Sequence, residues 1–538
     1  MKFYKLISCF VLLSIFAIGF VNSSVHAETV NATDFGVTPG ENSSQTEALH
    51  DAMRYFYDQG EEGTVYIPAG TYYVDEALRF HEGVNLVGDG RGQTIIKKMG
   101  TSANYVVGNP ILHSNSVNLN VSVSDITFDA DRANRSSQGL SQIGGINIDA
   151  EVSNLRLDGI EIKDATNGAI LRRMRDSVIT NSVFDQTSGH SIATGDENYP
   201  VGEFTNVEIT NNVITNSTGG SGINLSRATY TTVRNNQVIN TQQQQDSYGG
   251  IRIPNGGAYN IVEDNVIQSY PRGIFVLTGA NNNTITGNTV IDSRIHGILI
   301  QANDNTFTNN TIVQNNTSLN PESMIRLAPG SNNTISNNLI STYSGYSNPG
   351  IRLTGDSNYN EITNNNIDTD GALVSNEAGS NNTISGNSEF NSVSFDSNSF
   401  YQIVNRNSGK LLEVTNASTS DGANIQQWTA NGCSCQNWSF VRNGDGYYNI
   451  INQNSGKAID VYDFSTANGA NIVQWSNLNG INQQWSIIQN TDGYLRFINR
   501  NSGKTLEVEA KSSEDGGNVV QWSDNKGANQ QWNIEQVN

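Results

Sequence analysis

The densest group of chemically active side chains lies at residues 188–199, which read Ser-Gly-His-Ser-Ile-Ala-Thr-Gly-Asp-Glu-Asn-Tyr. This stretch supplies His190, Asp196 and Glu197, and it interrupts an otherwise regular repeat. Two carboxyl groups can hydrolyse a glycosidic bond that lies between them when one is protonated and the other is ionised. The stretch therefore predicts a site that cleaves a polysaccharide.

The second acid of such a pair is expected from another coil, because adjacent residues on a strand point to opposite faces. Asp149 and Asp131 are the candidate partners. Arg252 is expected about two coils further along, roughly 10 Å away at the usual strand spacing. The predicted catalytic residues are thus Asp196, Glu197, His190, Asp149 and Arg252, with Asp129 and Asp131 as alternative acids.

Elimination from a uronate is the alternative chemistry, and it needs a base near the C5 proton and a cation at the carboxylate. Arginines could bind uronate or sulfate groups, although salt bridges to neighbouring acids would explain them equally well. The arginines in question are Arg172, Arg173, Arg175, Arg252, Arg326 and Arg352. Hydrolysis is favoured because paired acids are visible. No cofactor or metal is expected, except calcium if the protein is a lyase.

A repeat between residues 115 and 390 indicates the elements that position these side chains. An apolar residue, two turn residues and an asparagine recur at steps of 22 to 29 residues. Short alternating strands with turns at such a period describe the coils of a solenoid. The asparagines are predicted to form an internal amide ladder from coil to coil. They are Asn212, Asn236, Asn265, Asn288, Asn310, Asn338, Asn365 and Asn387.

A second recurring pattern, Gly-Ile-x-apolar, predicts the strands of one face of the solenoid. The residue at its centre should point outward. This gives a column of Asn147, Asn224, Arg252, Phe275, Leu299, Arg326 and Arg352. Before the repeat, residues 43–56 predict an amphipathic helix with a capping-type start at Ser43–Glu47, suited to cover the open end of the solenoid.

A separate repeat occupies the region from about residue 400 to the end. Trp428, Trp475 and Trp522 are spaced by 47 residues, and so are Trp438, Trp485 and Trp532. Three equal copies rich in short strands predict a closed three-fold β-structure.

This region resembles the ricin-type β-trefoil, or family 13 carbohydrate-binding module, through Gln-Gln-Trp at 483–485 and 530–532 and Gln436-Asn-Trp438. The resemblance implies that the second tryptophan of each copy packs in the core and the first stacks on a sugar, while a carboxylate and amides bind its hydroxyls. The implied binding residues are Glu413, Trp428 and Gln436, then Asp460, Trp475, Asn482 and Gln483, then Glu507, Trp522, Asn529 and Gln530. Cys435 replaces the asparagine of the first copy. A purely structural trefoil is the alternative.

Residues 30–388 resemble the pectate lyase superfamily of right-handed parallel β-helices, which includes relatives of glycoside hydrolase family 28. The residues that carry the resemblance are the N-terminal helix, Val65-Tyr-Ile-Pro-Ala-Gly-Thr-Tyr72 and the asparagine coils. Thr194-Gly-Asp196-Glu197 looks like the Gly-Asp-Asp element of family 28, but the histidine of that family is absent and Pro254 replaces its lysine. The same stretch is placed like the Gly-Tyr-Gly-Phe-Asp-Pro-His of mannuronan epimerases, with His190, Ala193 and Gly195 at the tyrosine, aspartate and histidine.

The start of the chain predicts export. A basic beginning, an uncharged run from Leu6 to Phe20 and Ala27 at the cleavage site indicate a signal peptide, so the protein is expected to be secreted and extracellular. Cys433 and Cys435 are read as two incidental thiols, being close together and too few for a disulfide framework. A net charge of −21 argues against nucleic acid as a partner.

The predicted fold class is all-β: a right-handed parallel β-helix with an N-terminal helical cap, followed by a β-trefoil. The predicted divisions are a signal peptide at 1–27, a putative catalytic β-helix at 28–392, a linker at 393–399 and the carbohydrate-binding trefoil at 400–538. The predicted function is a secreted, monomeric glycoside hydrolase that degrades a polysaccharide and has no membrane contact after signal cleavage. A lyase or C5-epimerase acting on uronate polymers is one alternative, and a non-catalytic glycan-binding surface protein is another.

Overall fold

The structure is a computed structural model that describes residues 28–195, 198–241, 245–378 and 381–537. The predicted signal peptide and the predicted acids Asp196 and Glu197 lie outside the described residues. No helix in the described ranges is both long enough and apolar enough to cross a membrane.

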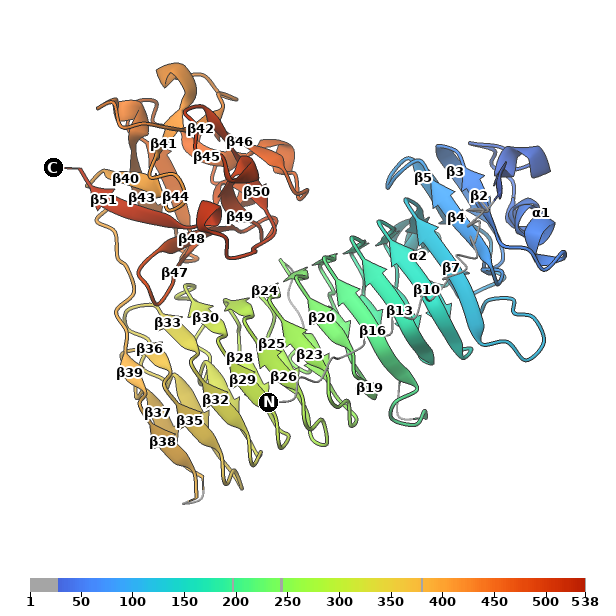
Figure 1. Cartoon of the computed structure of the whole chain (residues 1–538), viewed down its shortest axis with the longest axis horizontal. Coiled ribbons are helices and arrows are strands. Elements are labelled where there is room, and N and C mark those ends of the chain that lie inside the picture. The colour runs from blue at the N-terminus through green and yellow to red at the C-terminus, as the bar shows by residue number, and fades with distance from the viewer. Residues whose placement is uncertain (1–27, 196–197, 242–244, 379–380, 538) are drawn as a thin grey trace, which may run out of the picture.

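The first domain is a parallel β-helix whose coils contribute strands to three long sheets, here called A, B and C (Figure 1). Sheet A contains β1 (Glu28–Asn31), β2 (Gly63–Ile67), β4 (Val84–Gly88), β7 (Asn118–Ser124), β10 (Val152–Asp158), β13 (Met174–Thr180), β16 (Phe204–Thr210), β19 (Ala228–Thr229), β20 (Thr232–Arg234), β23 (Ile261–Glu263), β26 (Thr284–Thr286), β29 (Thr306–Thr308), β32 (Thr334–Ser336), β35 (Glu361–Thr363) and β38 (Thr383–Ser385). Sheet B contains β3 (Gly70–Val74), β5 (Thr94–Lys98), β8 (Thr127–Asp129), β11 (Glu161–Lys163), β14 (Val183–Asp185), β17 (Val213–Thr215), β21 (Gln237–Ile239), β24 (Val266–Gln268), β27 (Thr289–Ile291), β30 (Thr311–Gln314), β33 (Leu339–Thr342), β36 (Asn366–Asp368) and β39 (Ser388–Glu389).

Sheet C carries the predicted Gly-Ile strands. It contains β6 (Tyr105–Val107), β9 (Gly144–Ile148), β12 (Ala169–Leu171), β15 (Ile192–Ala193), β18 (Ile223–Asn224), β22 (Gly249–Ile253), β25 (Arg272–Val276), β28 (His296–Ile300), β31 (Ile325–Leu327), β34 (Ile351–Leu353) and β37 (Val374–Asn376). The predicted outward column is confirmed, since Asn224, Arg252, Phe275, Leu299 and Arg326 pair in register along successive strands. Their strand neighbours, such as Ile251 and Ile253, are fully buried in the core.

The predicted asparagine ladder is confirmed. Asn288 is fully buried, and its Oδ1 accepts bonds from the backbone N–H and the side-chain amide of Asn265 at 3.1 and 2.9 Å. The same pair of bonds repeats from Asn212 through Asn387. A second ladder, which the sequence analysis did not single out, runs through Asn260, Asn283, Asn305, Asn333, Asn360 and Asn382.

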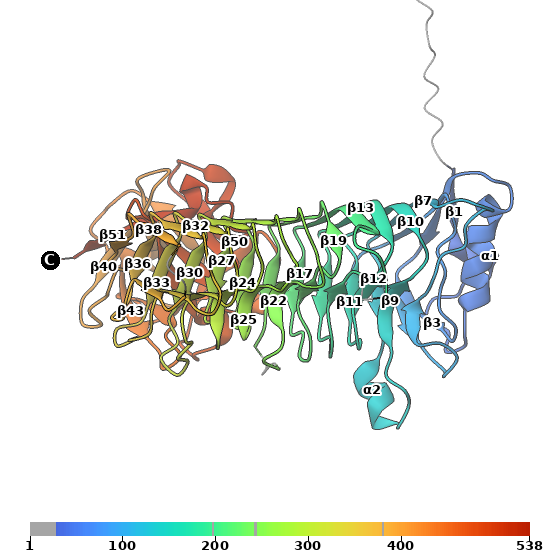
Figure 2. The same cartoon turned by 90° about the horizontal axis from the view of Figure 1, so that it is seen from below.

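The predicted end cap is α1 (Thr46–Tyr57), which closes the N-terminal end of the β-helix (Figure 2). Its own residues Leu49, Ala52, Met53 and Phe56 form the predicted apolar face and are buried against the core of the β-helix. The predicted capping start is wrong, because the N-cap residue is Gln45 and its side chain makes no capping bond. The hydroxyls of Ser44 and Thr46 bond instead to Asp75. A short helix, α2 (Arg132–Ser137), projects from the coil that also contains β9.

The second domain is a β-trefoil with three copies of four strands. The strands are β40 (Tyr401–Asn405), β41 (Leu411–Val414), β42 (Ile425–Trp428) and β43 (Asn437–Arg442); β44 (Tyr448–Asn452), β45 (Ala458–Val461), β46 (Ala470–Trp475) and β47 (Trp485–Gln489); and β48 (Leu495–Asn499), β49 (Thr505–Val508), β50 (Gly517–Trp522) and β51 (Trp532–Gln536). Trp438, Trp485 and Trp532 are fully buried, as predicted. The prediction of two free thiols is wrong, because Cys433 and Cys435 form a disulfide that closes a short turn.

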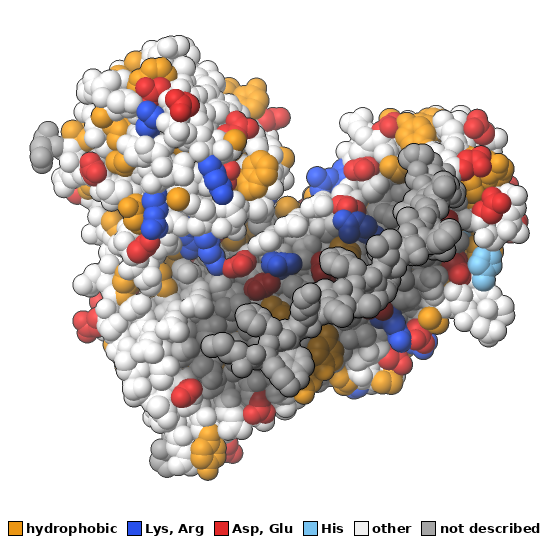
Figure 3. Space-filling view, viewed as in Figure 1, with side chains coloured by type: hydrophobic (Ala, Val, Ile, Leu, Met, Phe, Trp, Pro, Cys, Tyr) orange, Lys and Arg blue, Asp and Glu red, His pale blue; other side chains and the backbone are white. Residues whose placement is uncertain are grey.

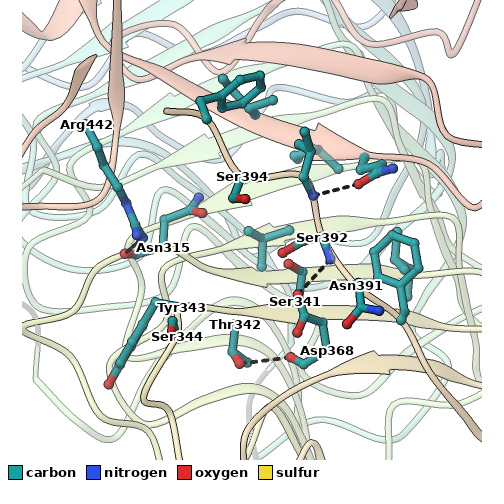
Figure 4. Close-up of a pocket in the computed structure, with 18 of the residues that line it drawn as sticks. Asn315, Ser341, Thr342, Tyr343, Ser344, Asp368, Asn391, Ser392, Ser394 and Arg442 are labelled. Carbon is teal, nitrogen blue, oxygen red and sulfur yellow. Dashed lines mark hydrogen bonds between the residues drawn. The ribbon is translucent and has the colours of Figure 1, made fainter. Parts of the chain in front are cut away.

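The trefoil packs on the outer face of sheet B. Val266, Ile291 and Val313 of the β-helix form one apolar cluster with Ile488 and Ile498 of the trefoil. At the junction, a pocket of 290 Å³ lies between the last coils, the connecting segment and the trefoil, where Ser392 donates to Asp368 at 2.9 Å (Figure 4). The predicted linker begins at Val393, whose N–H donates to Gln489 of the trefoil at 2.7 Å. The connecting segment is thereby tied to both domains.

Candidate functional site

Two groups of polar side chains occupy the outer face of sheet C. The first, here called the Asp149 cluster, consists of Asn147, Asp149, Arg172 and Tyr199. Arg172 Nη1 donates to Asn147 Oδ1 at 2.8 Å and lies 3.8 Å from Asp149 Oδ1. The Tyr199 hydroxyl donates to the same carboxylate oxygen of Asp149. The Asp149 side chain is 41% exposed, so this carboxylate remains accessible from solvent.

The second group, here called the Arg252 cluster, consists of His190, Tyr248, Arg252, Arg272 and Phe275. The guanidinium groups of Arg252 and Arg272 lie 5.8 and 4.9 Å from the centre of the Phe275 ring. Neither arginine forms a salt bridge within the described part of the chain, and both Nε atoms are buried without a hydrogen-bond partner there. Two guanidinium groups without a carboxylate partner favour an anionic ligand.

Arg272 was missed at the sequence level. It begins β25, outside the centre of the Gly-Ile pattern, but its alignment with Gly249 brings it to the same outer face as Arg252. The other arginines of the column are neutralised. Arg352 bonds Glu377 at 2.9 Å and Arg326 pairs with Glu322. Arg173 and Arg175 are likewise engaged by Glu151. The salt-bridge alternative therefore holds for these four side chains.

His190 links two neighbouring coils and contacts Tyr248, so it holds other residues of the Arg252 cluster in place. Its Nδ1 accepts the backbone N–H of Ser221 at 2.9 Å, which links two coils, and its ring meets Tyr248 edge-on at 5.3 Å. Burial, with the charge of Arg252, lowers the pKa of His190 to about 4, so the ring is neutral near pH 7. Because Nδ1 is an acceptor, the proton resides on Nε2, and His190 has no free basic nitrogen.

The alternative acids lie away from sheet C, at the end of β8. Asp129, Asp131 and Asp164 bring carboxylate oxygens within 4.8 Å of one another, which is an arrangement that could hold a cation. Lys97 Nζ is already 2.9 Å from Asp131 and 3.4 Å from Asp129. The ammonium group of Lys97 thus balances much of this charge, and Asp131 does not reach the Asp149 cluster as a catalytic partner.

The second trefoil copy forms an open pocket of 270 Å³. Asp460 lies at its base and accepts bonds from the amides of Asn482 and Gln483 at 3.0 and 2.9 Å. Trp475 and Tyr462 form the walls, with ring centres 6.4 Å apart. The Oδ1 of Asn482 is buried and has no partner among the described residues. An aromatic wall beside a carboxylate held by two amides suits the apolar face and hydroxyls of a sugar.

The three predicted sugar pockets differ. In copy one, Glu413 is held by the amides of Gln436, Asn431 and Gln426 at 2.8 to 3.1 Å, and Cys435 supplies no amide. In copy three, Glu507 is bonded by Gln530 at 2.6 Å, and Asn529 Oδ1 is buried without a described partner, as in copy two. Trp428 and Trp522 are 36% and 39% exposed. Copies two and three therefore retain unfilled acceptors, whereas the carboxylate of copy one is saturated.

Trp475→Ala is expected to weaken sugar binding at the second pocket about tenfold, since losing an aromatic stack costs about 1–1.5 kcal/mol. The thermal midpoint should change little, because Trp475 lies at the wall of an open pocket. Trp428→Ala is the matched control and should leave glycan binding unchanged. Titration calorimetry with a neutral oligosaccharide checks both variants. Equal losses of affinity in the two variants would contradict the expectation that sugar binds at the second pocket and not at the first.

Binding at the second pocket is also expected to depend on pH. Burial raises the pKa of Asp460 to about 6, against the opposing effect of the Gln483 and Asn482 amides. The ionised form accepts sugar hydroxyls, so affinity should fall as pH drops through about 6. Because the pKa of Asp460 is raised from 3.8 to about 6 in the folded state, protonation of Asp460 favours folding, and this contribution is lost as pH rises through about 6. Asp460→Asn should remove the pH dependence of sugar affinity measured by titration calorimetry. If the affinity of the variant still falls below pH 6 as in the wild type, Asp460 is not the group that titrates.

The comparisons with known proteins agree with both domains. Residues 29–252 match the model described as rhamnogalacturonase A/epimerase, pectate lyase-like. Residues 201–367 and 250–419 match the right-handed β-helix region, and residues 387–475 and 481–538 match the ricin-type β-trefoil lectin domain-like model. The chain thus joins a pectate lyase-like right-handed β-helix to a ricin-type β-trefoil, as the sequence predicted.

Relatives of the β-helix are known from Azotobacter vinelandii. The mannuronan C5-epimerase AlgE3 is 32% identical over 152 residues, which are 27% of this chain and 8% of that protein. AlgE5 is 27% identical over 227 residues, covering 37% of this chain and 23% of that protein. The chain therefore spans under a quarter of the length of these relatives. The A-module of AlgE6 aligns over 68% of this chain and 100% of its own length, with 18% identity and a TM-score of 0.51, which supports the fold.

Proposed function

We propose that this protein is an enzyme that removes the C5 proton of a uronate residue in a polysaccharide, at the Asp149 cluster on sheet C. The proposal rests on the bond from the Tyr199 hydroxyl to Asp149 on an exposed face, beside the guanidinium of Arg172. Six curated relatives, all mannuronan C5-epimerases, support this alternative over the glycoside hydrolysis that the sequence favoured.

The step follows from this arrangement. Tyr199 Oη takes the C5 proton as its own proton passes to Asp149 Oδ1. The electron pair left on C5 delocalises into the uronate carboxyl group, and a guanidinium group stabilises the developing negative charge. Reprotonation of C5 from the opposite face by a solvent water gives the C5 epimer, and Asp149 then returns its proton to solvent. In the alternative outcome the bond from C4 to its oxygen breaks, the leaving oxygen takes the proton from Tyr199, and an unsaturated chain end remains.

The Arg252 cluster extends this surface along the β-helix. Strand β22, which carries Arg252, is four strand steps from β9 in sheet C, or about 19 Å at the usual spacing of about 4.8 Å. An extended polysaccharide lying along sheet C would reach both clusters. Arg252 and Arg272 would then hold the carboxylate of a uronate several units from the reacting sugar.

Reaction in D₂O with polymannuronate, polyguluronate and polygalacturonate tests the proposal. Epimerisation places deuterium at C5 without chain cleavage, which proton NMR detects. Elimination produces an unsaturated end with ultraviolet absorbance. Hydrolysis raises reducing ends without either signal, and that outcome would replace the proposal with the hydrolase prediction. We further propose that the enzyme works outside the cell, in keeping with its predicted signal peptide.

A non-catalytic glycan-binding protein is the second candidate. In the stretch placed like the mannuronan epimerase motif, Ala193 and Gly195 stand where that family has an aspartate and a histidine. Ala193 is 6% exposed and offers no group for proton transfer. Tight binding of a uronate polymer, with no deuterium uptake, unsaturation or new reducing ends, would favour this candidate.

A further inference from the structure

The three trefoil copies treat one equivalent lysine differently. Lys410 and Lys457 each pair with an aspartate of a neighbouring copy, Asp515 at 2.7 Å and Asp421 at 2.6 Å. The third lysine, Lys504, is only 3% exposed and forms no salt bridge within the described ranges. Its Nζ instead meets two neutral groups, Gln237 Oε1 at 2.8 Å and Ser523 Oγ at 3.4 Å.

A single replacement accounts for the missing partner. The position equivalent to Asp421 and Asp515, 47 residues from each, is Asn468. Asn468 Oδ1 keeps the structural role of these aspartates, since it accepts the Ser523 N–H at 3.0 Å as they accept theirs at 2.7 Å. The fold of the loop is therefore preserved while its negative charge is lost. A buried cation without a carboxylate is costly unless an anion joins it.

Lys504 lines a groove of 770 Å³ between the trefoil and the β-helix. Trp522, the aromatic platform of the third sugar pocket, lies in the trefoil wall, and Arg91 lies in the β-helix wall. Figure 3 shows the hollow between the trefoil and the N-terminal part of the β-helix, with basic side chains on both walls. Burial and the charge of Arg91 lower the pKa of Lys504 to about 7.

The β-helix wall adds a row of amides. Asn181, Asn211 and Asn235 are turn residues of three successive coils, each with positive φ, and all three line the groove. Two acids also line the groove, and of these only Asp524 forms a salt bridge within the described residues. Glu161 accepts the Thr127 hydroxyl at 2.7 Å, and Asp524 is paired with Arg496. The groove thus offers two cations, amides at coil spacing and one aromatic face.

We propose that this groove is a binding site for an acidic polysaccharide, in which Trp522 stacks on a sugar ring and Lys504 and Arg91 hold its carboxylate or sulfate group. The site is separate from sheet C, and its existence does not depend on the reaction proposed there. A chain bound here would be kept beside the β-helix, which raises its local concentration at the enzyme.

Titration calorimetry of the full chain tests the proposal with three probes: a mannuronate hexamer, a sulfated heparin hexasaccharide and neutral mannohexaose. Trp475→Ala serves as the background, so that the second trefoil pocket binds about tenfold more weakly and contributes less to the signal. At least one acidic probe is expected to bind ten times more tightly than mannohexaose. The uronate and heparin arms distinguish carboxylate from sulfate recognition.

Asn468→Asp is the decisive variant, because it restores the aspartate that the other two copies possess. It should lower affinity for the acidic probe about tenfold and leave the thermal midpoint unchanged or higher. Lys504→Gln should show the same loss, whereas Lys457→Gln, whose lysine is already paired, should show none. An Asn468→Asp variant with wild-type affinity, or equal binding of acidic and neutral probes, would overturn the proposal. If the groove binds the acidic probe but the protein turns over none of the three uronate polymers, that result counts against the sheet C proposal alone.

Discussion

Tyr199→Phe is expected to lower turnover on a uronate polymer at least 100-fold, as is typical for removal of a general acid–base group. The substitution deletes the hydroxyl that bonds to Asp149 but keeps the aromatic ring. Asp149→Asn should cause a similar loss, because an amide cannot take the tyrosine proton. The double variant should be little worse than either single one, since both residues serve one proton transfer.

Tyr230→Phe is the matched control. Tyr230 is 62% exposed and stacks on Tyr259, away from sheet C, with ring centres 5.2 Å apart. The Tyr230→Phe variant should retain full activity, and all variants should keep the wild-type thermal midpoint. Initial rates of C5 deuteration or ultraviolet absorbance provide the measurement. If Tyr199→Phe stays within a few-fold of the wild type, the proton acceptor is another group, and Asp196 and Glu197 become the residues to replace.

Much of the fold could be predicted because its repeats impose local rules that a single sequence displays. The Trp438, Trp485 and Trp532 series predicted three copies, and in the structure each indole donates to a backbone carbonyl at the equivalent place. The asparagine spacing predicted stacked coils for a similar reason. An amide ladder needs one residue type at one point of every turn.

The candidate site could be predicted only in part, because its contacts join coils that are distant in sequence. Tyr199 reaches Asp149 across 50 residues, and Arg173 reaches Glu203 across 30. The sequence identified six arginines but missed Arg272, and it could not show which of the six are neutralised. His190 was predicted to be catalytic because of its neighbours, yet Ser221 of the next coil occupies its basic nitrogen.

The packing of the trefoil on the β-helix could not be predicted from the sequence either. Gly503 belongs to the repeated Asn-x-Asn-Ser-Gly-Lys turn, where its φ of 64° accounts for the glycine. In the structure, an added Cβ there would also lie 2.8 Å from Ile239 of the β-helix. The adjacent Lys504 turns toward Gln237 in the same contact. Local rules explain the turn, but only the packed domains reveal that this turn of the third copy contacts the β-helix.

Asn288→Ala is expected to destabilise the β-helix by about 3 kcal/mol or more. The Asn288 amide donates to Val262 O, Thr286 O and Asn310 Oδ1, and its carbonyl oxygen accepts two bonds from Asn265. Alanine removes all five bonds and leaves the buried backbone N–H of Asn265 without its acceptor. Each such group costs about 1–3 kcal/mol, and the loss falls in the middle of the solenoid, where no end can fray to relieve it.

Asn303→Ala provides the control for this ladder variant. Asn303 lies on an exposed turn, and its side chain accepts one bond, from the Ser331 N–H at 2.8 Å. Its replacement should cost about 1 kcal/mol or less, because water can satisfy the freed N–H. Chemical unfolding followed by circular dichroism measures both variants. If Asn288→Ala has the same free energy of unfolding as the control, the five lost bonds carry no net free energy, and the buried ladder does not stabilise the β-helix.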